Sequence, residues 1–402
     1  MVPKGWEVKS FEDVAFVGNG QVDPREEPYS SMWHIGPENV TSDTGRIKNV
    51  RQCSELGLIS GKYEFDRESI VYSKIRPNLN KVCRPDFDGV CSADMYPIWT
   101  KEGLFADYLF YYMLGPKFYS TAVSMSMRTG MPKINRTDLD TIKINIPPLP
   151  EQQKIAKILS TWDKAISTTE RLIDNSTQQK KALMQQLLTG KKRLLDDEGK
   201  RFEGEWARQP ISFVADVITG NTPSTKNQEY YGGGKLFVSP SDLGISKYIV
   251  ETTKRLTDLG FSQTRKVPKG SSLFTCIGST IGKLGIAGEE LATNQQINSV
   301  CAKGNNCGEF IYYQLLFHAE QIKGSAATQA VPIINKTNFE SQLIFSPASL
   351  EEQQKIATVL TNADKEIELL EQQLADLQQE KKALMQVLLT GKKRVVVSGE
   401  EV

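Results

Sequence analysis

The side chains best suited to chemistry in this chain lie on two short polar segments of its first half. Residues 74–81 read KIRPNLNK, and residues 123–135 read VSMSMRTGMPKIN. Arg, Lys, Asn, Gln, Ser and Thr carry donors and acceptors that fit the edges of DNA bases, with Arg favouring guanine and Asn or Gln favouring adenine. Such residue types on loops indicate a surface able to read a base sequence.

The second half carries matched segments with different residue types, in which residues 276–283 read CIGSTIGK and residues 326–335 read AATQAVPIIN. For any one of these residues, a solvated loop without a ligand is the simpler interpretation, so the hypothesis depends on their grouping. The candidate DNA contacts are Lys74, Arg76, Asn78, Asn80, Lys81, Arg128, Lys133 and Asn135 in the first half, and Thr275, Ser279, Thr280, Lys283, Gln329, Asn335 and Lys336 in the second.

An internal repeat organises the elements that must position these loops. Residues 151–193 begin with EQQKIA and end with KKALMQQLLTGKKR, and residues 352–394 begin with the same six letters and end with KKALMQVLLTGKKR. The offset of 201 residues, 352 minus 151, is half of the 402-residue chain. The sequence therefore predicts two tandem copies of one unit, each a variable region followed by this shared segment.

Each shared segment is predicted to form one long helix. Each follows a proline-bearing stretch and ends before a glycine, Gly190 or Gly391, that suits a helix C-terminus. Residues 151–189 would span about 58 Å at about 1.5 Å per residue. Apolar residues recur with 4-3 spacing along both segments, interrupted at Thr169, Ser176 and Lys180 in the first and only at Lys381 in the second. This period is typical of two helices that pack on each other as a coiled coil.

The orientation of the two helices is left open by this pattern, because parallel and antiparallel pairs both bury such a stripe. A second clue is the length of the segments that follow Gly190 and Gly391. The tail followed by the N-terminal segment is nearly as long as the internal link between the first helix and the second variable region. This suggests a two-fold relation between the units, with the N-terminal and C-terminal segments near one another.

The two variable regions are predicted to share a mixed α/β fold. Both contain a Tyr-Tyr pair, at 111–112 and 312–313, and a Pro-x-Ile-Asn-x-Thr motif, at 132–137 and 332–337. Short β-branched and aromatic runs predict strands, and longer apolar runs without turn residues predict helices. The predicted strands are residues 69–75, 142–146 and 273–277, and the predicted helices are residues 104–114 and 309–321.

Composition excludes several classes of protein. With 49 basic and 48 acidic residues the net charge is +1, so an overall cationic field is not what attracts a partner. The sequence shows no secretory h-region and no apolar run long enough for a membrane span, so we expect a cytoplasmic protein. Six cysteines without a C-x-x-C pair predict buried thiols. His34 and His318 lack metal-ligand spacing, so no metal site is predicted, and we expect hydrogen-bonded structural histidines.

Each candidate catalytic motif in the sequence lacks a residue that its chemistry requires, so the chain by itself is expected not to be an enzyme. Residues 278–284, GSTIGKL, are too short for a P-loop and lack its Ser or Thr after the lysine, so we interpret them as a turn. Residues 145–149, NIPPL, lack the aromatic residue of an adenine methyltransferase motif. Pro85-Asp86 has no downstream acidic-x-lysine partner of the kind that a nuclease needs.

The doubled EQQKIA and KKALMQ-x-LLTGKKR segments, each after a divergent globule, resemble the specificity subunit of type I restriction-modification enzymes over essentially the whole chain. The resemblance implies two target recognition domains that each read half of a split, asymmetric DNA sequence, with antiparallel helices as the spacer. It implies as partners double-stranded DNA, two methyltransferase subunits that bring S-adenosylmethionine, and motor-nuclease subunits. The implied domains are recognition domain 1 (1–150), spacer helix 1 (151–193), a linker (194–205), recognition domain 2 (206–351), spacer helix 2 (352–394) and a tail (395–402).

Polar residues that are identical in both copies suggest where a partner docks. Two-fold matched surfaces are what two identical partner subunits require. The candidate partner-binding residues are Glu151, Gln152, Gln153, Lys154, Glu352, Gln353, Gln354 and Lys355. Two alternatives stay open, a coiled-coil scaffold whose globules bind proteins and a specificity subunit of a methylation-only phage-defence system.

Overall fold

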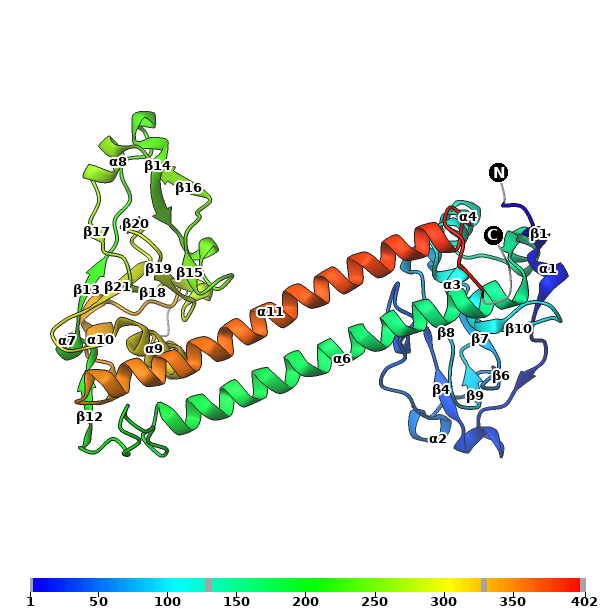
Figure 1. Cartoon of the computed structure of the whole chain (residues 1–402), viewed down its shortest axis with the longest axis horizontal. Helices are drawn as coiled ribbons and strands as arrows, with labels where there is room; N and C mark the ends of the chain where they lie inside the picture. The colour runs from blue at the N-terminus through cyan, green and yellow to red at the C-terminus, as the bar shows by residue number, and fades with distance from the viewer. Residues whose placement is uncertain (1–2, 127–131, 327–330, 398–402) are drawn as a thin grey trace. The chain divides into compact units, whose positions relative to one another are not determined.

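The computed structural model describes residues 3–126, 132–326 and 331–397 (Figure 1). The chain divides into two compact units. Unit 1 consists of residues 1–170 and 372–402, and unit 2 consists of residues 171–371. Each unit therefore holds one globule, the N-terminal half of the long helix that follows that globule in the chain, and the C-terminal half of the other long helix.

The two long helices are α6 (Leu149–Leu187) and α11 (Leu350–Leu388), each 39 residues long. Both begin and end two residues earlier than the repeat predicted. Gly190 and Gly391 then adopt φ of 67° and 72°. This left-handed conformation, which glycine tolerates without a Cβ clash, turns the chain away from each helix end.

Within each unit the halves of α6 and α11 run antiparallel. In unit 1, Glu151 of α6 pairs with Arg394 beyond the end of α11, and Asp163 further along α6 pairs with Lys381 earlier in α11. In unit 2 the matched pairs are Arg193 with Glu352 and Lys180 with Asp364. The residue numbers rise along one helix while they fall along the other, which settles the orientation that the sequence left open.

The apolar stripe of both helices is the less exposed side of each, as its period predicted. In unit 1, Ile155 and Leu159 of α6 share a buried cluster with Leu388 of α11. In unit 2, Leu187 of α6 shares a cluster with Ile356 and Leu360 of α11. The stripe is also continuous with the core of each globule, so the helices are held to the globules by the same apolar burial that joins them.

The globule of unit 1 consists of two sheets, a two-stranded ribbon and short helices. The ribbon pairs β1 (Glu7–Ser10) with β11 (Lys143–Ile146). One sheet has the order β2-β10-β7-β8, formed by Ala15–Val17, Met95–Thr100, Ile70–Ser73 and Val82–Cys83. The other has the order β3-β6-β9-β4-β5, formed by Gln21–Val22, Lys62–Phe65, Gly89–Cys91, Trp33–Ile35 and Arg51–Gln52. The helices are α1 (Phe11–Val14), α2 (Cys53–Leu56), α3 (Ala106–Leu114), α4 (Pro116–Ser126) and α5 (Arg136–Thr141).

Unit 2 repeats this architecture. Its ribbon pairs β12 (Trp206–Pro210) with β22 (Leu343–Pro347). One sheet has the order β13-β21-β18-β19-β15, formed by Ala215–Thr219, Ile297–Ala302, Ser272–Thr275, Leu284–Ala287 and Tyr248–Ile249. The other has the order β16-β14-β20-β17, formed by Lys254–Leu256, Tyr231–Val238, Leu291–Thr293 and Lys266–Val267. The helices are α7 (Ile211–Val214), α8 (Asp258–Ser262), α9 (Gly308–Gly324) and α10 (Lys336–Glu340).

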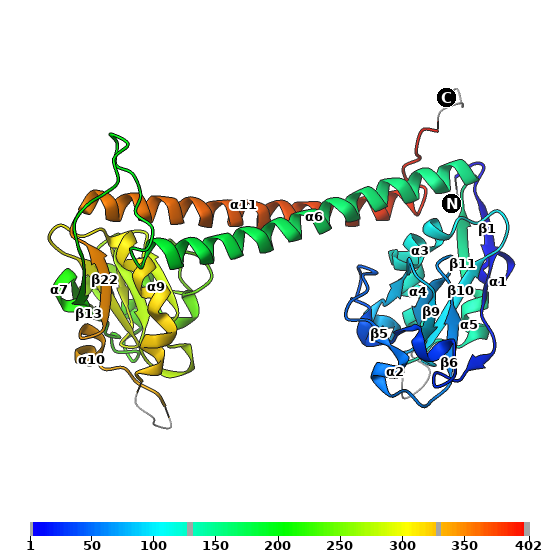
Figure 2. The same ribbon diagram turned by 90° about the horizontal axis from the view of Figure 1, so that it is seen from below.

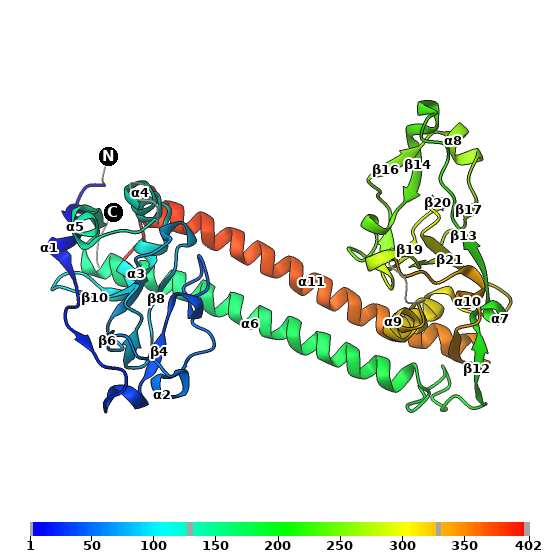
Figure 3. The same cartoon turned by 180° about the vertical axis from the view of Figure 1, so that it is seen from behind.

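One helix in each globule connects the sheet to the long helices. In unit 1, α3 lies between the strands β8 and β10 and the helix α6 (Figure 2). In unit 2, α9 lies between β18 and β19 and the helix α11 (Figure 3). The hydroxyl of Tyr111 on α3 donates to Asp163, and the hydroxyl of Tyr313 on α9 donates to Asp364. Tyr111 therefore matches Tyr313, which shifts the sequence alignment of the two Tyr-Tyr pairs by one residue.

Most of the predicted elements are confirmed, and so is the mixed α/β fold. The predicted strands 69–75, 142–146 and 273–277 contain β7, β11 and most of β18, and the predicted helices contain α3 and most of α9. Lys4 and Arg394 are in contact, as expected for adjacent terminal segments, because Arg394 Nη1 donates to the Lys4 carbonyl over 3.2 Å. Four of the six cysteines are buried, whereas Cys301 and Cys307 are partly exposed.

The prediction of a hydrogen-bonded structural histidine is wrong for His34. His34 is buried in β4, and neither of its ring nitrogens meets a hydrogen-bond partner within residues 3–126, 132–326 and 331–397. The matched residue in β14 is Phe237, because both strands pair in parallel with equivalent strands, β9 and β20. His34 thus occupies a site that the fold builds for an apolar ring. His318 has a ring nitrogen 3.2 Å from the Gln321 side chain.

Candidate nucleic-acid interface

Three loops of unit 1 meet at the ends of the strands β7 and β10, and we call them the three-loop cluster of unit 1. They are residues 74–80, 92–94 and 132–135. The Lys74 amide donates to the Asp94 carbonyl over 3.0 Å, and the Ile134 amide donates to the Lys74 carbonyl over 2.9 Å. Ile75 and Lys133 form an antiparallel bridge. The two predicted base-reading segments therefore lie side by side, joined by backbone hydrogen bonds.

The three-loop cluster of unit 2 consists of residues 276–282, 294–296 and 332–335, and has the same hydrogen bonds. The Cys276 amide donates to the Gln296 carbonyl over 2.8 Å, and the Ile334 amide donates to the Cys276 carbonyl over 2.9 Å. Ile277 and Ile333 form the equivalent bridge. Because only backbone atoms make these contacts, the side chains on the loops are free to differ between the units.

The first loop of each cluster needs two residues with positive φ. In unit 1 they are Arg76 and Asn80, with φ of 49° and 46°. In unit 2 they are Gly278 and Gly282, with φ of 81° and 95°. Asn is tolerated in this region because its side chain can satisfy local partners, whereas an arginine is uncommon there. The predicted turn at residues 278–284 is confirmed, since Gly278–Thr280 form a 3-10 turn.

Most of the predicted DNA contacts are accessible in the clusters. Arg128 and Gln329 lie outside the residues that the structure describes. Lys74 and Lys81 of unit 1 and Thr280 of unit 2 are half-buried. The fully accessible candidates are Arg76, Asn78, Lys133 and Asn135 in unit 1 and Ser279, Lys283, Asn335 and Lys336 in unit 2.

Two predicted contacts are buried and must be corrected to structural residues. Asn80 is 5% exposed, and its amide donates to Asp43 over 3.0 Å and to the Leu114 carbonyl over 3.1 Å. Thr275 has no exposed surface. Asn80 fixes the left-handed turn and Thr275 ends β18, so neither side chain can reach a base in this conformation.

Two predicted lysines have matched structural contacts. Lys81 Nζ donates to the Pro37 carbonyl over 2.5 Å, and Lys283 Nζ approaches the Pro240 carbonyl at 3.5 Å. Both carbonyls open a 3-10 turn, Pro37–Asn39 or Pro240–Asp242. Lys81 and its match Lys283 therefore support the same loop in their respective units.

Sequence reasoning missed residues that the fold adds to the clusters from the third loop. Asp94 is exposed in unit 1, and its counterpart Gln296 is half-buried in unit 2, next to the exposed Gln295. The run Asn294-Gln295-Gln296 was a signal of the same polar type as the predicted loops. Nothing in the sequence indicated that it lies beside residues 276–282, because that contact is made only when β18 and β21 pair.

Arg136, which also escaped prediction, anchors the cluster of unit 1. It donates to the Gly18 carbonyl over 2.6 Å and to the Asn19 side chain. Its guanidinium carbon lies 5.4 Å from the centre of the Tyr96 ring, and Lys74 Nζ lies 5.3 Å from the same centre. Burial raises the pKa of Tyr96, so its ring stays neutral between the two cations.

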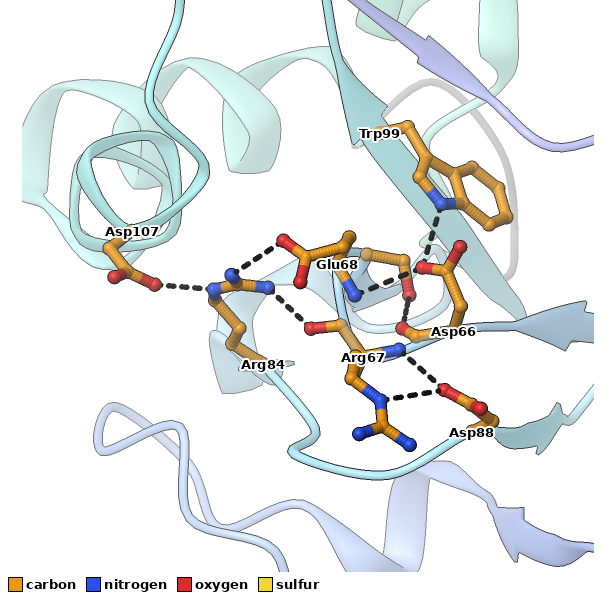
Figure 4. A network of polar contacts seen from close by, with 8 residues as sticks. Asp66, Arg67, Glu68, Arg84, Asp88, Trp99 and Asp107 are labelled. Carbon is orange, nitrogen blue, oxygen red and sulfur yellow. Dashed lines mark hydrogen bonds and ion pairs between the residues drawn. The ribbon is translucent and has the colours of Figure 1, made fainter.

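A neighbouring groove of unit 1 is unsuited to phosphate. The groove has a volume of about 430 Å³ and its lining includes Glu64, Asp66 and Asp88. Trp99 Nε1 donates to Asp66 over 2.9 Å, and the Arg67 amide donates to Asp88 over 3.0 Å (Figure 4). Arg84 joins this network through Asp107, Glu68 and the Arg67 carbonyl. The carboxylates hold the turn between β6 and β7 and would repel a DNA backbone.

Half of the predicted partner-binding residues are buried, which corrects the prediction for Glu151, Gln152, Glu352 and Gln353. Arg394 pairs with Glu151, which also accepts from Trp6 Nε1 over 3.3 Å. Arg193 pairs with Glu352, its Nε lying 2.5 Å from Oε1. These carboxylates close each helix against the segment beyond the end of the other long helix, so a partner cannot touch them directly.

The buried glutamines join the helices to the globules in the same way. Gln152 accepts from the Phe105 amide over 2.8 Å, and Gln353 accepts from the Cys307 amide over 2.9 Å. Phe105 directly precedes α3 and Cys307 directly precedes α9, and the backbone amides at the start of a helix need acceptors. The remaining predicted partner residues are accessible. Gln153, Lys154 and Gln354 are exposed, and Lys355 is half-buried beside Asp197 at 2.6 Å.

The described residues present neither a cluster of metal ligands nor a helix able to cross a membrane. Residues 3–126, 132–326 and 331–397 contain no group of three or more His, Cys, Asp or Glu side chains arranged to hold a metal ion. Within the same ranges no helix has the length and apolar character that crossing a membrane requires.

Comparisons with known proteins agree with this geometry. The family model of the type I restriction modification DNA specificity domain matches residues 3–175 and again residues 203–379. The chain is 33% identical over 240 residues to the Type I restriction enzyme EcoDI specificity subunit of Escherichia coli, a match that covers 58% of this chain and 51% of that one. It thus spans about half the length of that relative.

Other relatives match over nearly their whole length. The chain is 23% identical to the Putative type I restriction enzyme MjaX specificity subunit of Methanocaldococcus jannaschii, over 98% of this chain and 95% of that one. Its fold is similar to that of the crystal structure of the Type-I restriction-modification system S subunit from M. genitalium, with a TM-score of 0.62, 13% identity and coverage of 95% and 96%. The doubled cluster, the doubled helix and the doubled family match lead to one conclusion: this chain belongs to the type I restriction modification DNA specificity family, whose function is the recognition of a DNA target.

Proposed function

We propose that each unit reads one half of a bipartite, asymmetric DNA target through its three-loop cluster. The observation that carries this proposal is one backbone arrangement built twice with unlike exposed side chains. Arg76 and Lys133 of unit 1 stand where Gly278 and Ile333 stand in unit 2. Equal backbones with unequal side chains are what two readers of different sequences require.

The helices set the distance between the two half-sites in this proposal. Both α6 and α11 continue without a break for 39 residues, about 58 Å at about 1.5 Å per residue. Their seam is interrupted by two charged pairs, Lys381 with Asp163 and Lys180 with Asp364. A polar residue inside an apolar seam fixes helix register, because sliding the helices would bury an unpaired charge.

Binding to DNA in this proposal depends on partner subunits. The net charge of +1 gives the chain little general attraction for DNA, so a single unit would bind weakly. Two methyltransferase subunits, which would bring S-adenosylmethionine, dock on the matched accessible residues, the exposed Gln153, Lys154 and Gln354 and the half-buried Lys355. Motor-nuclease subunits complete a restricting complex. The chain itself contributes recognition and no catalysis.

The spacing role is tested by removing four residues from the middle of each long helix. Because B-DNA rises about 3.4 Å per base pair and one helical turn about 5.4 Å, the gap between half-sites should shorten by one or two base pairs. Target mapping by methylome sequencing measures both halves and their separation. The matched control substitutes alanine for the same exposed residues without changing helix length, and should keep the gap. An unchanged gap in the shortened protein would refute the spacing role.

A further inference from the structure

Three matched positions of the two clusters carry opposite recognition chemistry. The backbone hydrogen bonds pair Arg76 with Gly278, because their amides donate to the carbonyls of Pro132 and Pro332. They likewise pair Asp94 with Gln296 through Lys74 and Cys276. The isolated bridges pair Lys133 with Ile333. Two cations and a carboxylate in unit 1 thus correspond to a glycine, an aliphatic residue and an amide at the matched positions of unit 2.

Arg76 is held in a conformation that its residue type disfavours. Its φ is 49°, in the left-handed region where unit 2 has Gly278. Its exposed side chain has no hydrogen bond or ion pair within residues 3–126, 132–326 and 331–397, so no contact in the described protein compensates for the strain. Pro77, which is buried, follows it directly, and its ring fixes the φ of the next residue of the loop. Strain of this kind is typical of functional positions, where a ligand supplies the missing contact.

The neighbours of Arg76 fit one kind of base pair. Arginine and lysine donate to the O6 and N7 atoms of guanine, and a carboxylate accepts from the N4 amino group of cytosine. Lys133 is exposed beside Arg76, and Asp94 is exposed on the adjoining loop. Neither side chain has a partner in the described part of the chain. A guanine would accept from the cations Arg76 and Lys133, and its paired cytosine would donate to the carboxylate of Asp94.

The cluster of unit 2 fits the other kind of base pair. A glutamine amide matches the N6 and N7 atoms of adenine, and an aliphatic group contacts the methyl group of thymine. Gln296 Oε1 accepts from Asn294 Nδ2 over 3.0 Å, which leaves its own amide donors available. Ile333 is 39% exposed although it is aliphatic, and Val331 beside it is 53% exposed.

We propose that, at this shared position, unit 1 reads a G·C pair and unit 2 reads an A·T pair. The inference rests on the proposed function, because it assumes that the clusters face the major groove. Arg76 is the main specificity-determining residue of the first half-site in this scheme, and Gln296 with Ile333 has that role in the second. The asymmetry of the target then follows from three side-chain differences on one conserved loop geometry.

The test uses the full chain in complex with methyltransferase subunits and a pool of duplexes with random sequence. The wild-type complex should enrich a split motif with a guanine in one half, and Arg76→Gly should abolish the preference for that guanine alone. Loss of one bidentate contact corresponds to about 1–3 kcal/mol, or roughly 5- to 150-fold in affinity for the guanine-containing duplex. Arg76→Gly should also keep or raise the melting temperature, because glycine relieves the positive φ.

Matched variants separate base reading from other roles. Arg76→Lys keeps the charge but loses the planar fork, so the guanine preference should weaken. Lys48→Gln removes an exposed cation from another loop of unit 1 and should leave the preference unchanged. Gln296→Ala should weaken the preference for adenine in the second half-site and leave the first half-site unchanged.

Three results overturn the inference. They are a split motif without guanine at the position affected by Arg76→Gly, a loss of affinity in that variant that is equal for all sequences, and a fall in melting temperature that accounts for the loss. The proposed function survives each of these results. Enrichment of no split motif by the wild-type complex would instead overturn the proposed function itself.

Discussion

The exposed loops of the two units differ far more than the backbone that supports them. Unit 1 presents Arg76, Asp94 and Lys133 where unit 2 presents Gly278, Gln296 and Ile333. The hydrogen bonds beneath them join backbone atoms and are the same in both units. The comparison teaches that a scaffold whose loop contacts are made by the backbone can exchange its readers without being rebuilt.

The buried contacts of the two units also differ in the number of side chains that donate hydrogen bonds to the matched glutamates, Glu151 and Glu352. Glu151 of unit 1 accepts from both Trp6 and Arg394. Glu352 of unit 2 has Arg193 as its side-chain donor, and Nε1 of Trp206, the match of Trp6, meets no partner in the described chain. Two side chains thus donate to Glu151, whereas a single side chain, through two N–H groups, donates to Glu352.

The largest expected effect follows from this difference and concerns Arg193→Ala. Glu352 has no exposed side-chain surface, so loss of Arg193 would strand a buried charge, at a cost of about 3 kcal/mol. Arg394→Ala should cost less, roughly 1–2 kcal/mol, because Trp6 still donates to Glu151 and Arg394 is 42% exposed. Thermal unfolding of both variants measures the difference.

The control for this pair restores volume without charge, by combining Arg193→Met with Glu352→Gln. If the stranded charge causes the loss, the double variant should recover most of the stability. Equal losses for Arg193→Ala and Arg394→Ala would show that the donor count does not matter.

A smaller effect is expected at the charged pairs inside the helix seam. Lys381→Ala leaves Asp163 with the Tyr111 hydroxyl at 2.8 Å and should cost about 2 kcal/mol. Lys180→Ala should cost about 1 kcal/mol, because Lys247 stays near Asp364 and donates to the Tyr313 hydroxyl over 2.9 Å. Melting temperatures of the two single variants rank the pairs. In the Lys247→Ala background the difference should disappear, and a persisting difference would contradict this explanation.

The smallest effect is visible only in acid and involves His34. Burial lowers its pKa below the ordinary value of 6.5, and the nearby Lys62 lowers it further, against a smaller opposite influence of Glu38. Above pH 6.5 the histidine is neutral in both folded and unfolded states. As the pH falls below 6.5 the unfolded chain takes up the proton first, so stability decreases until the pH passes the folded pKa.

The matched unit supplies the control, because Phe237 occupies the equivalent position. His34→Phe should remove this part of the loss in melting temperature between pH 7 and pH 5. At pH 5 the melting temperature of the variant should be at least equal to that of the wild-type protein. An unchanged pH dependence would show that other groups carry it.

The fold was largely predictable because its strongest signals are local or repeated. The 201-residue repeat predicts two units, and the apolar period predicts the paired helices to within two residues at each end. Lys180 and Lys381 interrupt the pattern for a reason that the sequence could not give, since their partners Asp364 and Asp163 lie on the other helix.

The candidate site was predictable only in part. Residues 74–80 and 132–135 were identified by residue type, yet Asn80 turned out to be buried and Asp94 was missed. Glu151 and Gln152 have the residue types of a surface, but they are buried and accept hydrogen bonds from Arg394 and from the Phe105 amide. A polar residue can be buried only where the fold supplies hydrogen-bond partners for it. Residue types along the chain do not indicate which distant residues those partners are.

Sequence by itself determined the duplication, the helices and the kinds of side chain on each loop, because these depend on neighbours along the chain or on identity between copies. Tertiary structure alone decided the antiparallel course of the helices within each unit, the meeting of three distant loops and the burial of the shared glutamates. Those features arise from hydrogen bonds and ion pairs between residues up to 243 positions apart. Their energy depends on geometry in the folded state and leaves no local pattern in the sequence.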